Sequence, residues 1–175
     1  MASAATPALA ALRAAGVPHR VLRYHHDPRR RGFGAEAVAQ LTGPDHPGIL
    51  PDQVFKTLIL AGPAGLAVAV LPVPARLSLK AAAAALGLAA VRLADPAEAQ
   101  RATGYVTGGI SPLGQRRSLP AVVDASALEF TEILCSAGRR GWDVALAPGD
   151  LVALTAAVTA DIRTGQTPPR PAGGH

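Results

Sequence analysis

A single lysine stands inside an apolar stretch, VFKTLIL at residues 54–60, and is the side chain best placed for chemistry. Successive side chains of a strand alternate between faces, so Lys56 is expected to share its face with Val54 and Leu58. An ammonium among buried neighbours is costly unless it meets a partner or a ligand, which makes Lys56 a candidate site residue. The competing interpretation is an edge-strand lysine that discourages aggregation, and this stretch alone leaves both open.

A second candidate is the glycine-rich stretch GYVTGGISPLG at residues 104–114. A nucleotide phosphate loop needs GxxxxGK[ST], but Ile110 and Ser111 follow Gly109 where Lys and Ser/Thr are required. The dinucleotide pattern GxGxxG fails as well, because Gly108 and Gly109 are adjacent. Two interpretations remain: a hairpin with a Ser-Pro turn, or a backbone wall that a ligand approaches closely.

Neither a metal site nor a protein nucleophile is indicated. Four histidines, His19, His25, His26 and His46, lack the spacing of a metal motif, and no GxSxG elbow is present. Cys135, the only cysteine, lies in an apolar strand pattern and is expected in the core. With one cysteine no internal disulfide can form, which is consistent with a reducing compartment.

The chain is basic, with a net charge of +5, which favours polyanionic partners. Arginines cluster at residues 29–31, 116–117 and 139–140. Each cluster could be a solvated loop. Three clusters in one small domain also fit contacts to RNA phosphates, and Arg116, Arg117, Arg139 and Arg140 are the candidates for this role.

The elements that must position these residues are short and alternate in type. Many short strands with interspersed short helices predict an α+β domain with a mixed sheet that curls on itself, barrel-like, with peripheral helices. Helices are predicted at 7–15, 34–42, 78–87, 95–104 and 148–157, and strands at 19–25, 53–61, 66–72, 91–94, 119–126, 129–138, 142–147 and 158–163.

No linker or repeat divides the 175 residues, so one domain is predicted over 1–163. The Pro/Gly-rich residues 164–175 are predicted to be a disordered tail. The N-terminus has no cationic region ahead of its apolar part, and no apolar stretch reaches the roughly 18 residues of a membrane span. We therefore expect a cytoplasmic protein without a membrane segment.

Three stretches carry a resemblance to a known family: VFKTL at 54–58, TGYVTGGISPLGQRRSLP at 103–120 and SAGRRGWDVALAPGDL at 136–151. They resemble the YbaK family, stand-alone relatives of the editing domain of bacterial prolyl-tRNA synthetase. RYHHDP, DPAEAQRATGYVTGGISP and the closing ADIR are most similar to its Cys-tRNA(Pro) deacylases. The resemblance extends from about Pro7 to Arg163.

The resemblance implies an enzyme that hydrolyses cysteine from mischarged tRNA(Pro), without a cofactor or metal. Binding alone separates small side chains only modestly, so a second, hydrolytic site is needed. In this family the thiol of the substrate attacks its own ester. Lys56 then matches the essential lysine, and the resemblance assigns the pocket to Tyr24, Phe33, Gly108, Gly109, Ser136 and Asp143.

Several departures bear on specificity. The loop TGPDHPGILPD at 42–52 is longer than usual for the family, RRR at 29–31 replaces a more polar stretch, and SAG replaces the commoner SGG. Two alternatives stay open: a deacylase of other specificity, for alanine or broader, that uses water, and a non-catalytic module that binds tRNA or a synthetase. The expected partners are aminoacyl-tRNA and, through the family, prolyl-tRNA synthetase.

Overall fold

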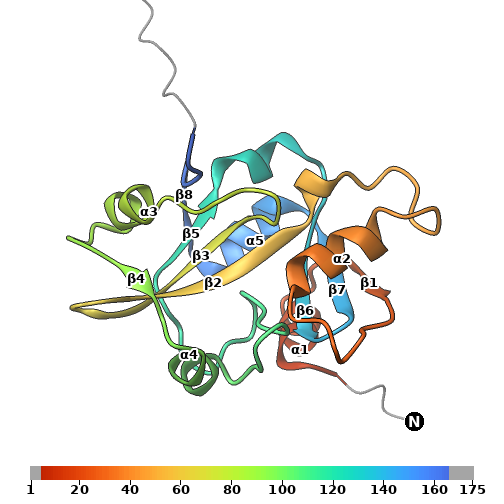
Figure 1. Cartoon of the computed structure of the whole chain (residues 1–175), viewed down its shortest axis with the longest axis horizontal. Coiled ribbons are helices and arrows are strands. Elements are labelled where there is room, and N and C mark those ends of the chain that lie inside the picture. Colours follow the sequence, from red (N-terminus) through yellow and green to blue (C-terminus); the bar gives the residue numbers. More distant parts are fainter. Residues whose placement is uncertain (1–4, 166–175) are drawn as a thin grey trace, which may run out of the picture.

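In the computed structural model, residues 5–165 are described, and they form five α-helices and eight strands (Figure 1). Almost every predicted element is present within a few residues of its predicted ends. The helices are α1 (Pro7–Ala14), α2 (Phe33–Leu41), α3 (Leu79–Leu86), α4 (Pro96–Thr103) and α5 (Pro148–Thr155). The strands are β1 (His19–Arg23), β2 (Phe55–Gly62), β3 (Gly65–Pro72), β4 (Arg92–Leu93), β5 (Ala121–Asp124), β6 (Ile133–Arg139), β7 (Trp142–Leu146) and β8 (Val158–Ala160).

Local signals explain where the helices begin and end. The Ser78 hydroxyl accepts a hydrogen bond from the Ala81 backbone N–H, 3.1 Å away, at the start of α3, as an N-cap residue does. Gly87 ends that helix in the left-handed conformation, which glycine adopts without strain. Asp95 takes the N-cap position of α4 as predicted, but its side chain makes no capping hydrogen bond.

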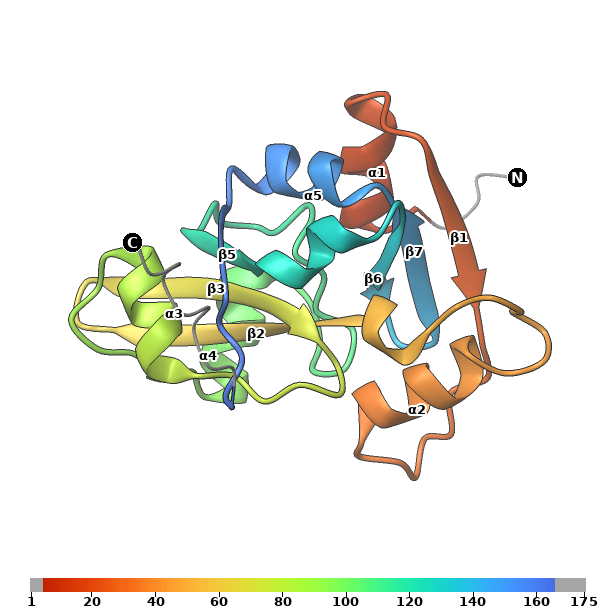
Figure 2. The same cartoon turned by 90° about the horizontal axis from the view of Figure 1, so that it is seen from above.

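The prediction of one curled, barrel-like sheet is wrong: the described strands form two open sheets (Figure 2). The large sheet has the order β4-β2-β3-β5-β8 and the small one β1-β7-β6. A barrel requires every strand to pair on both sides. Strand β6 pairs with β7, and among the described residues the only backbone bridge between the two sheets joins Val54 and Leu134. The large sheet is mixed, as predicted, because β5 runs parallel to both β3 and β8.

Both faces of the large sheet are covered. Phe55 and Ile59 of β2 join a core cluster that also contains residues of α1, α5 and the small sheet. Leu60, on the other face, joins a cluster with α3 and Ile162. Burial on both sides explains why β2 and β3 are almost continuously apolar.

The connection between β5 and β6 differs from the predicted pair of strands. Residues Ala125–Glu129 form a 3-10 turn, and β6 begins only at Ile133. The cause is Asp124, whose buried carboxylate accepts hydrogen bonds from the backbone and hydroxyl of Ser126. An aspartate that bonds the backbone two residues on favours a turn over a strand.

No described helix has the length and apolar character that crossing a membrane requires. Of the predicted tail, Thr164 and Gly165 are described, and the Thr164 N–H donates to the Arg76 carbonyl 2.9 Å away. Residues 166–175 lie outside the described part of the chain.

Candidate active site

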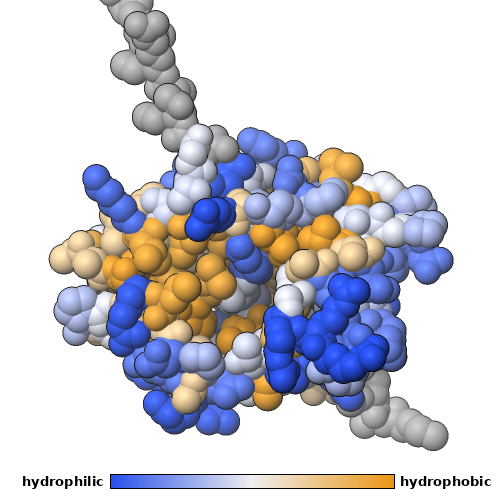
Figure 3. Space-filling view, in the orientation of Figure 1, coloured by the Kyte–Doolittle hydropathy of each residue, from blue (hydrophilic) through white to orange (hydrophobic). Residues whose placement is uncertain are grey.

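A cavity of about 360 Å³ is lined by residues of both sheets, the start of α2, the β4–α4 segment and the glycine-rich loop. In Figure 3 a hollow lies near the centre of the visible face, with apolar side chains over β2–β4 on one side and hydrophilic ones over the loop between β1 and α2 on the other. The lining contains all but one of the residues that the resemblance assigns to the pocket, namely Tyr24, Phe33, Lys56, Gly108, Ser136 and Asp143.

Lys56 is held by the chain itself rather than by an acid. Its Nζ donates to the carbonyl oxygens of Val73, at 3.1 Å, and Ala75, at 2.7 Å. The side chain is half-buried in the cavity wall, and this burial lowers the pKa of Lys56 below its ordinary value. An ammonium has three N–H donors, so one remains for a ligand in the cavity. The geometry suits a lysine aimed at a substrate oxygen.

Asp143 is the acidic residue of the cavity wall. It lies on β7, the central strand of the small sheet, opposite Leu22 of β1 and Ser136 of β6. Only 5% of the residue is exposed, and burial raises its pKa to about 7. No described residue donates a hydrogen bond or an ion pair to its carboxylate. A carboxyl group buried without a partner is unfavourable for the fold and is available to a cationic ligand.

Four residues of the lining carry hydroxyl groups: Tyr24, Thr57, Ser136 and Thr107. Burial, with Asp143 and Glu36 nearby, raises the pKa of the Tyr24 phenol well above its ordinary value, so it stays neutral. Ser136 Oγ accepts from the Gly138 N–H at 3.1 Å. Thr57 Oγ1 is buried and has no hydrogen-bond partner within residues 5–165. The sequence analysis missed Thr57, although a second polar residue beside Lys56 in an apolar strand was a usable signal.

The glycine-rich loop is not a hairpin but an irregular segment against the cavity. Gly108 has φ +84°, and a Cβ there would lie 2.5 Å from an atom of the Phe33 ring. Only glycine fits such a close approach with positive φ. Gly109, in contrast, lies outside the lining: a Cβ there would meet the backbone N of Arg140 at 3.1 Å. Gly109 therefore lets the loop pack on the β6–β7 turn.

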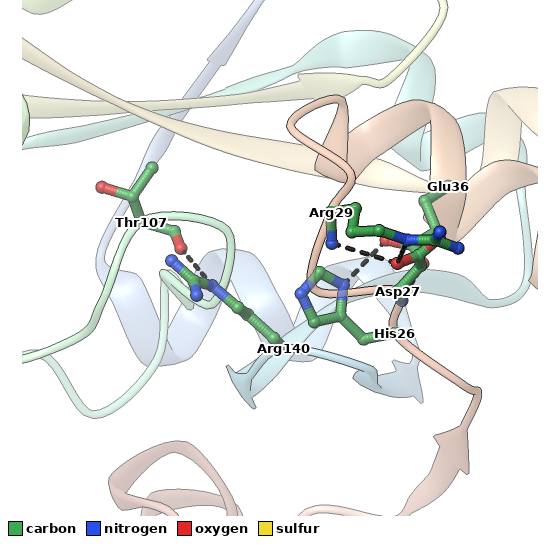
Figure 4. A network of polar contacts seen from close by, with 6 residues as sticks. All are labelled: His26, Asp27, Arg29, Glu36, Thr107 and Arg140. Carbon is green, nitrogen blue, oxygen red and sulfur yellow. Dashed lines mark hydrogen bonds and ion pairs between the residues drawn. The ribbon is translucent and has the colours of Figure 1, made fainter.

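Arg140 fastens this loop to the rest of the cavity wall (Figure 4). Its Nε donates to the Thr107 carbonyl at 2.8 Å, and its guanidinium lies 4.9 Å from the centre of the Phe33 ring. His26 also lies beside Phe33, with the two ring centres 5.7 Å apart, and its Nδ1 is 2.8 Å from the buried Glu36 carboxylate. Phe33 thus contacts two segments, the β6–β7 turn and the loop after β1, that the sequence alone did not connect to it.

The four arginines proposed from sequence as tRNA contacts have different neighbours. Arg139 lies over the Trp142 ring, 4.9 Å from its centre, and Arg140 braces the loop as described. Arg116 packs along Gly104. Arg117 borders a different cavity, on the far side of α4.

Neither a metal cluster nor a cysteine thiol is found at the site within the described part of the chain. Residues 5–165 contain no cluster of three His, Cys, Asp or Glu side chains able to hold a metal ion. Cys135 is fully buried in the core and is absent from the cavity lining. Burial raises the pKa of the Cys135 thiol, which keeps it protonated and inert.

Comparison with known proteins identifies the fold that carries this site. Residues 33–154, which include all the lining side chains except Tyr24, match the aminoacyl-tRNA editing domain. The chain belongs to this editing-domain family. The resemblance to YbaK proteins seen in the sequence is thereby confirmed.

Individual relatives of this editing domain agree with the assignment. An Enterococcus faecalis (strain ATCC 700802 / V583) protein named "Putative Cys-tRNA(Pro)/Cys-tRNA(Cys) deacylase EbsC" is 36% identical over 133 residues, covering 75% of this chain and 78% of the relative. A solved structure described as "a putative trans-editing enzyme for prolyl tRNA synthetase" is 28% identical, with a TM-score of 0.75, and covers 93% of this chain and 100% of that one. The crystal structure of "hypothetical protein APE2540" is 29% identical with a TM-score of 0.76, over 90% of this chain and 99% of that one.

Proposed function

We propose that this editing domain is a deacylase that hydrolyses cysteine from mischarged Cys-tRNA(Pro), with the thiol of the substrate as nucleophile. Family membership and the name of the E. faecalis relative support the reaction class. The volume of the cavity, about 360 Å³, lies at the small end of ligand sites and suits a small aminoacyl group. Its apolar wall, which includes Ile59 and Ile110, suits a thiol better than a charged side chain.

The observation that carries this proposal is the lack of an activated nucleophile among the lining residues. Serine, threonine and tyrosine hydroxyls attack esters only when a neighbouring base takes their proton. No histidine lines the cavity, and within residues 5–165 the Ser136 hydroxyl donates no hydrogen bond to Asp143 or to any other base. A thiol with a pKa of about 8.5 is a few per cent thiolate at neutral pH, so a cysteinyl substrate brings its own nucleophile.

The roles of the lining residues follow from their charges. In the proposed complex, the Asp143 carboxylate binds the α-ammonium of the cysteinyl group. The free N–H of Lys56 donates to the ester oxygen on which negative charge develops. The Gly108 backbone and the Phe33 ring confine the ester, so that the thiol and carbonyl carbon are held close together.

In the proposed cleavage, every bond that forms or breaks before the final hydrolysis lies within the substrate. A bond forms between the sulfur and the carbonyl carbon, and the bond between that carbon and the 3′-terminal oxygen of the tRNA breaks. The tRNA hydroxyl receives the proton that the thiol lost. The cyclic thiolactone released then opens in water to free cysteine.

A deacylation panel with Cys-, Ser-, Ala- and Pro-charged tRNA(Pro) tests the proposal. We expect rapid release of cysteine and slow release of the others, with Lys56→Ala as the inactive control. Faster turnover of Ala-tRNA than of Cys-tRNA contradicts it and favours a water-based deacylase. No turnover of any substrate favours a binding module without activity.

A further inference from the structure

A second cavity, of about 410 Å³, lies against the other side of α4. Its charged residues come from three separate segments: Arg92 on β4, Glu98 and Arg101 on α4, and Arg117 in the loop after the glycine-rich segment. Part of its floor is the turn between β2 and β3, where Gly62 faces Gly65. No step of the proposed reaction uses this cavity.

Helix α4 contributes residues to the walls of both cavities. Pro96 and Ala99, three residues apart, face the first cavity, whereas Glu98, Arg101 and Ala102 face the second. Side chains three and four residues apart share one face of a helix. A helix with its side chains is about 10–12 Å across, so the two cavities are separated by roughly the thickness of one helix.

The second cavity is positively charged and not neutralised by the chain. Arg101 and Arg117 are exposed and form no ion pair with any residue in the described part of the chain. Arg92 lies 3.9 Å from Glu98, which is the acid of the cavity. Three guanidinium groups against one carboxylate leave a net charge of about +2, in a concave surface that focuses the field.

We propose that this cavity binds a backbone phosphate of the tRNA acceptor end while the aminoacyl group occupies the first cavity. The proposal rests on the proposed function for the identity of the RNA. Guanidinium groups suit phosphate oxygens because they donate two parallel hydrogen bonds and remain charged. A chain that leaves the first cavity and crosses α4 brings the phosphates upstream of the terminal adenosine to Arg101 and Arg117.

Salt-dependent binding of uncharged tRNA(Pro) tests this site without any catalytic step. The variant is Arg101→Gln/Arg117→Gln, and the control is Arg13→Gln/Lys80→Gln, which removes the same charge from exposed positions on α1 and α3. Each lost phosphate contact lowers the slope of log affinity against log salt by about 0.7 for single-stranded and about 0.9 for duplex RNA treated like B-DNA. Both arginines contact the same phosphate in this proposal, so we expect the slope to fall by about 0.7–0.9 and the affinity by about tenfold or more, with a much smaller change for the control.

Equal slopes and affinities for the two double variants overturn the proposal, because the charge then acts only at long range. Glu98→Gln gives an opposite test: removing the one negative charge of the cavity should tighten tRNA binding, and weaker binding contradicts the site. These measurements are independent of the proposed function. If the double variant shows the predicted fall in slope but the wild-type protein releases no amino acid, the deacylase is refuted and the phosphate site is still supported.

Discussion

Replacing Asp143 by asparagine should make the protein more stable and less active. The carboxyl group is buried on the central strand of the small sheet, and burial raises its pKa from 3.8 to about 7. The folded protein therefore holds a proton that the unfolded chain releases at a much lower pH. Stability that is present while the carboxyl is protonated, below about pH 4, is lost as the pH rises through about 7.

The size of the effect follows from the same difference. The pKa of Asp143 is raised from 3.8 to about 7. At about 1.36 kcal/mol per pKa unit, ionisation of this carboxyl group destabilises the folded state by about 4 kcal/mol. Asparagine removes this destabilising charge, but its amide is buried without a hydrogen-bond partner, which costs about 1–3 kcal/mol of the stability gained. We expect Asp143→Asn to raise the free energy of unfolding at pH 8 by about 1–3 kcal/mol.

Urea unfolding of the wild type and Asp143→Asn between pH 4 and pH 8 measures this directly. The difference in unfolding free energy should grow from pH 4 to about pH 7 and stay constant above. Asp45→Asn, at an exposed loop position, should follow the wild type throughout. A difference between Asp143→Asn and the wild type that does not vary with pH refutes the reasoning.

The activity of Asp143→Asn should move in the opposite direction. If the carboxylate binds the substrate ammonium, losing a charged hydrogen bond lowers kcat/KM for Cys-tRNA by about 10- to 150-fold. In the wild type, kcat/KM should fall as the pH drops below about 7, where Asp143 gains its proton. An Asp143→Asn variant with the kcat/KM of the wild type would show that the Asp143 carboxylate does not bind the substrate.

Four further substitutions at three positions separate the roles of the other residues. Lys56→Ala should lower kcat by about 100- to 1000-fold, as expected for loss of a donor to a developing negative charge. Lys56→Arg should be badly impaired as well, because a planar fork does not replace a compact ammonium; near-normal rates in folded variants contradict this role. Cys135→Ser should keep its kcat while the free energy of unfolding falls by about 1–3 kcal/mol, since a hydroxyl is then buried in the core; lost turnover without unfolding would indicate a protein thiol nucleophile. Gly108→Ala should reduce kcat/KM and stability together, because a methyl group there collides with the Phe33 ring at positive φ; an unchanged variant would show that the loop does not need this close approach.

The elements of this fold could be predicted from local signals, whereas the way the strands pair could not. The Ser78 cap and the Gly87 end of α3 act within a few residues, and both were readable from the sequence. Whether β6 joins the large sheet depends on contacts between residues far apart in the chain. In the described residues the backbone pairing between the two sheets is limited to the bridge between Val54 and Leu134, and no local sequence pattern predicts it.

For the candidate site, too, some residues could be predicted from the local sequence and others could not. Lys56 stood out because an ammonium in an apolar strand is unusual, but its carbonyl partners on Val73 and Ala75 depend on how the chain leaves β3. Tyr24, Phe33 and Asp143 came from the family resemblance, since residues so far apart in sequence are brought together only by the tertiary fold. The bond from Arg140 to Thr107 was missed because an exposed arginine pair looks the same whether it binds RNA or its own chain.

The product formed from Cys-tRNA(Pro) tests the central claim most directly. The measurement is single-turnover deacylation of Cys-tRNA(Pro) and Ser-tRNA(Pro) across pH 6 to pH 9, with rapid trapping of the released product. A substrate thiol as nucleophile predicts a thiolactone as the first product, a rate that rises as the thiol ionises near its pKa of about 8.5, and far slower release of serine. Equal rates for the two substrates, with free cysteine as the first product and no thiolactone, would contradict the account and assign the attack to water.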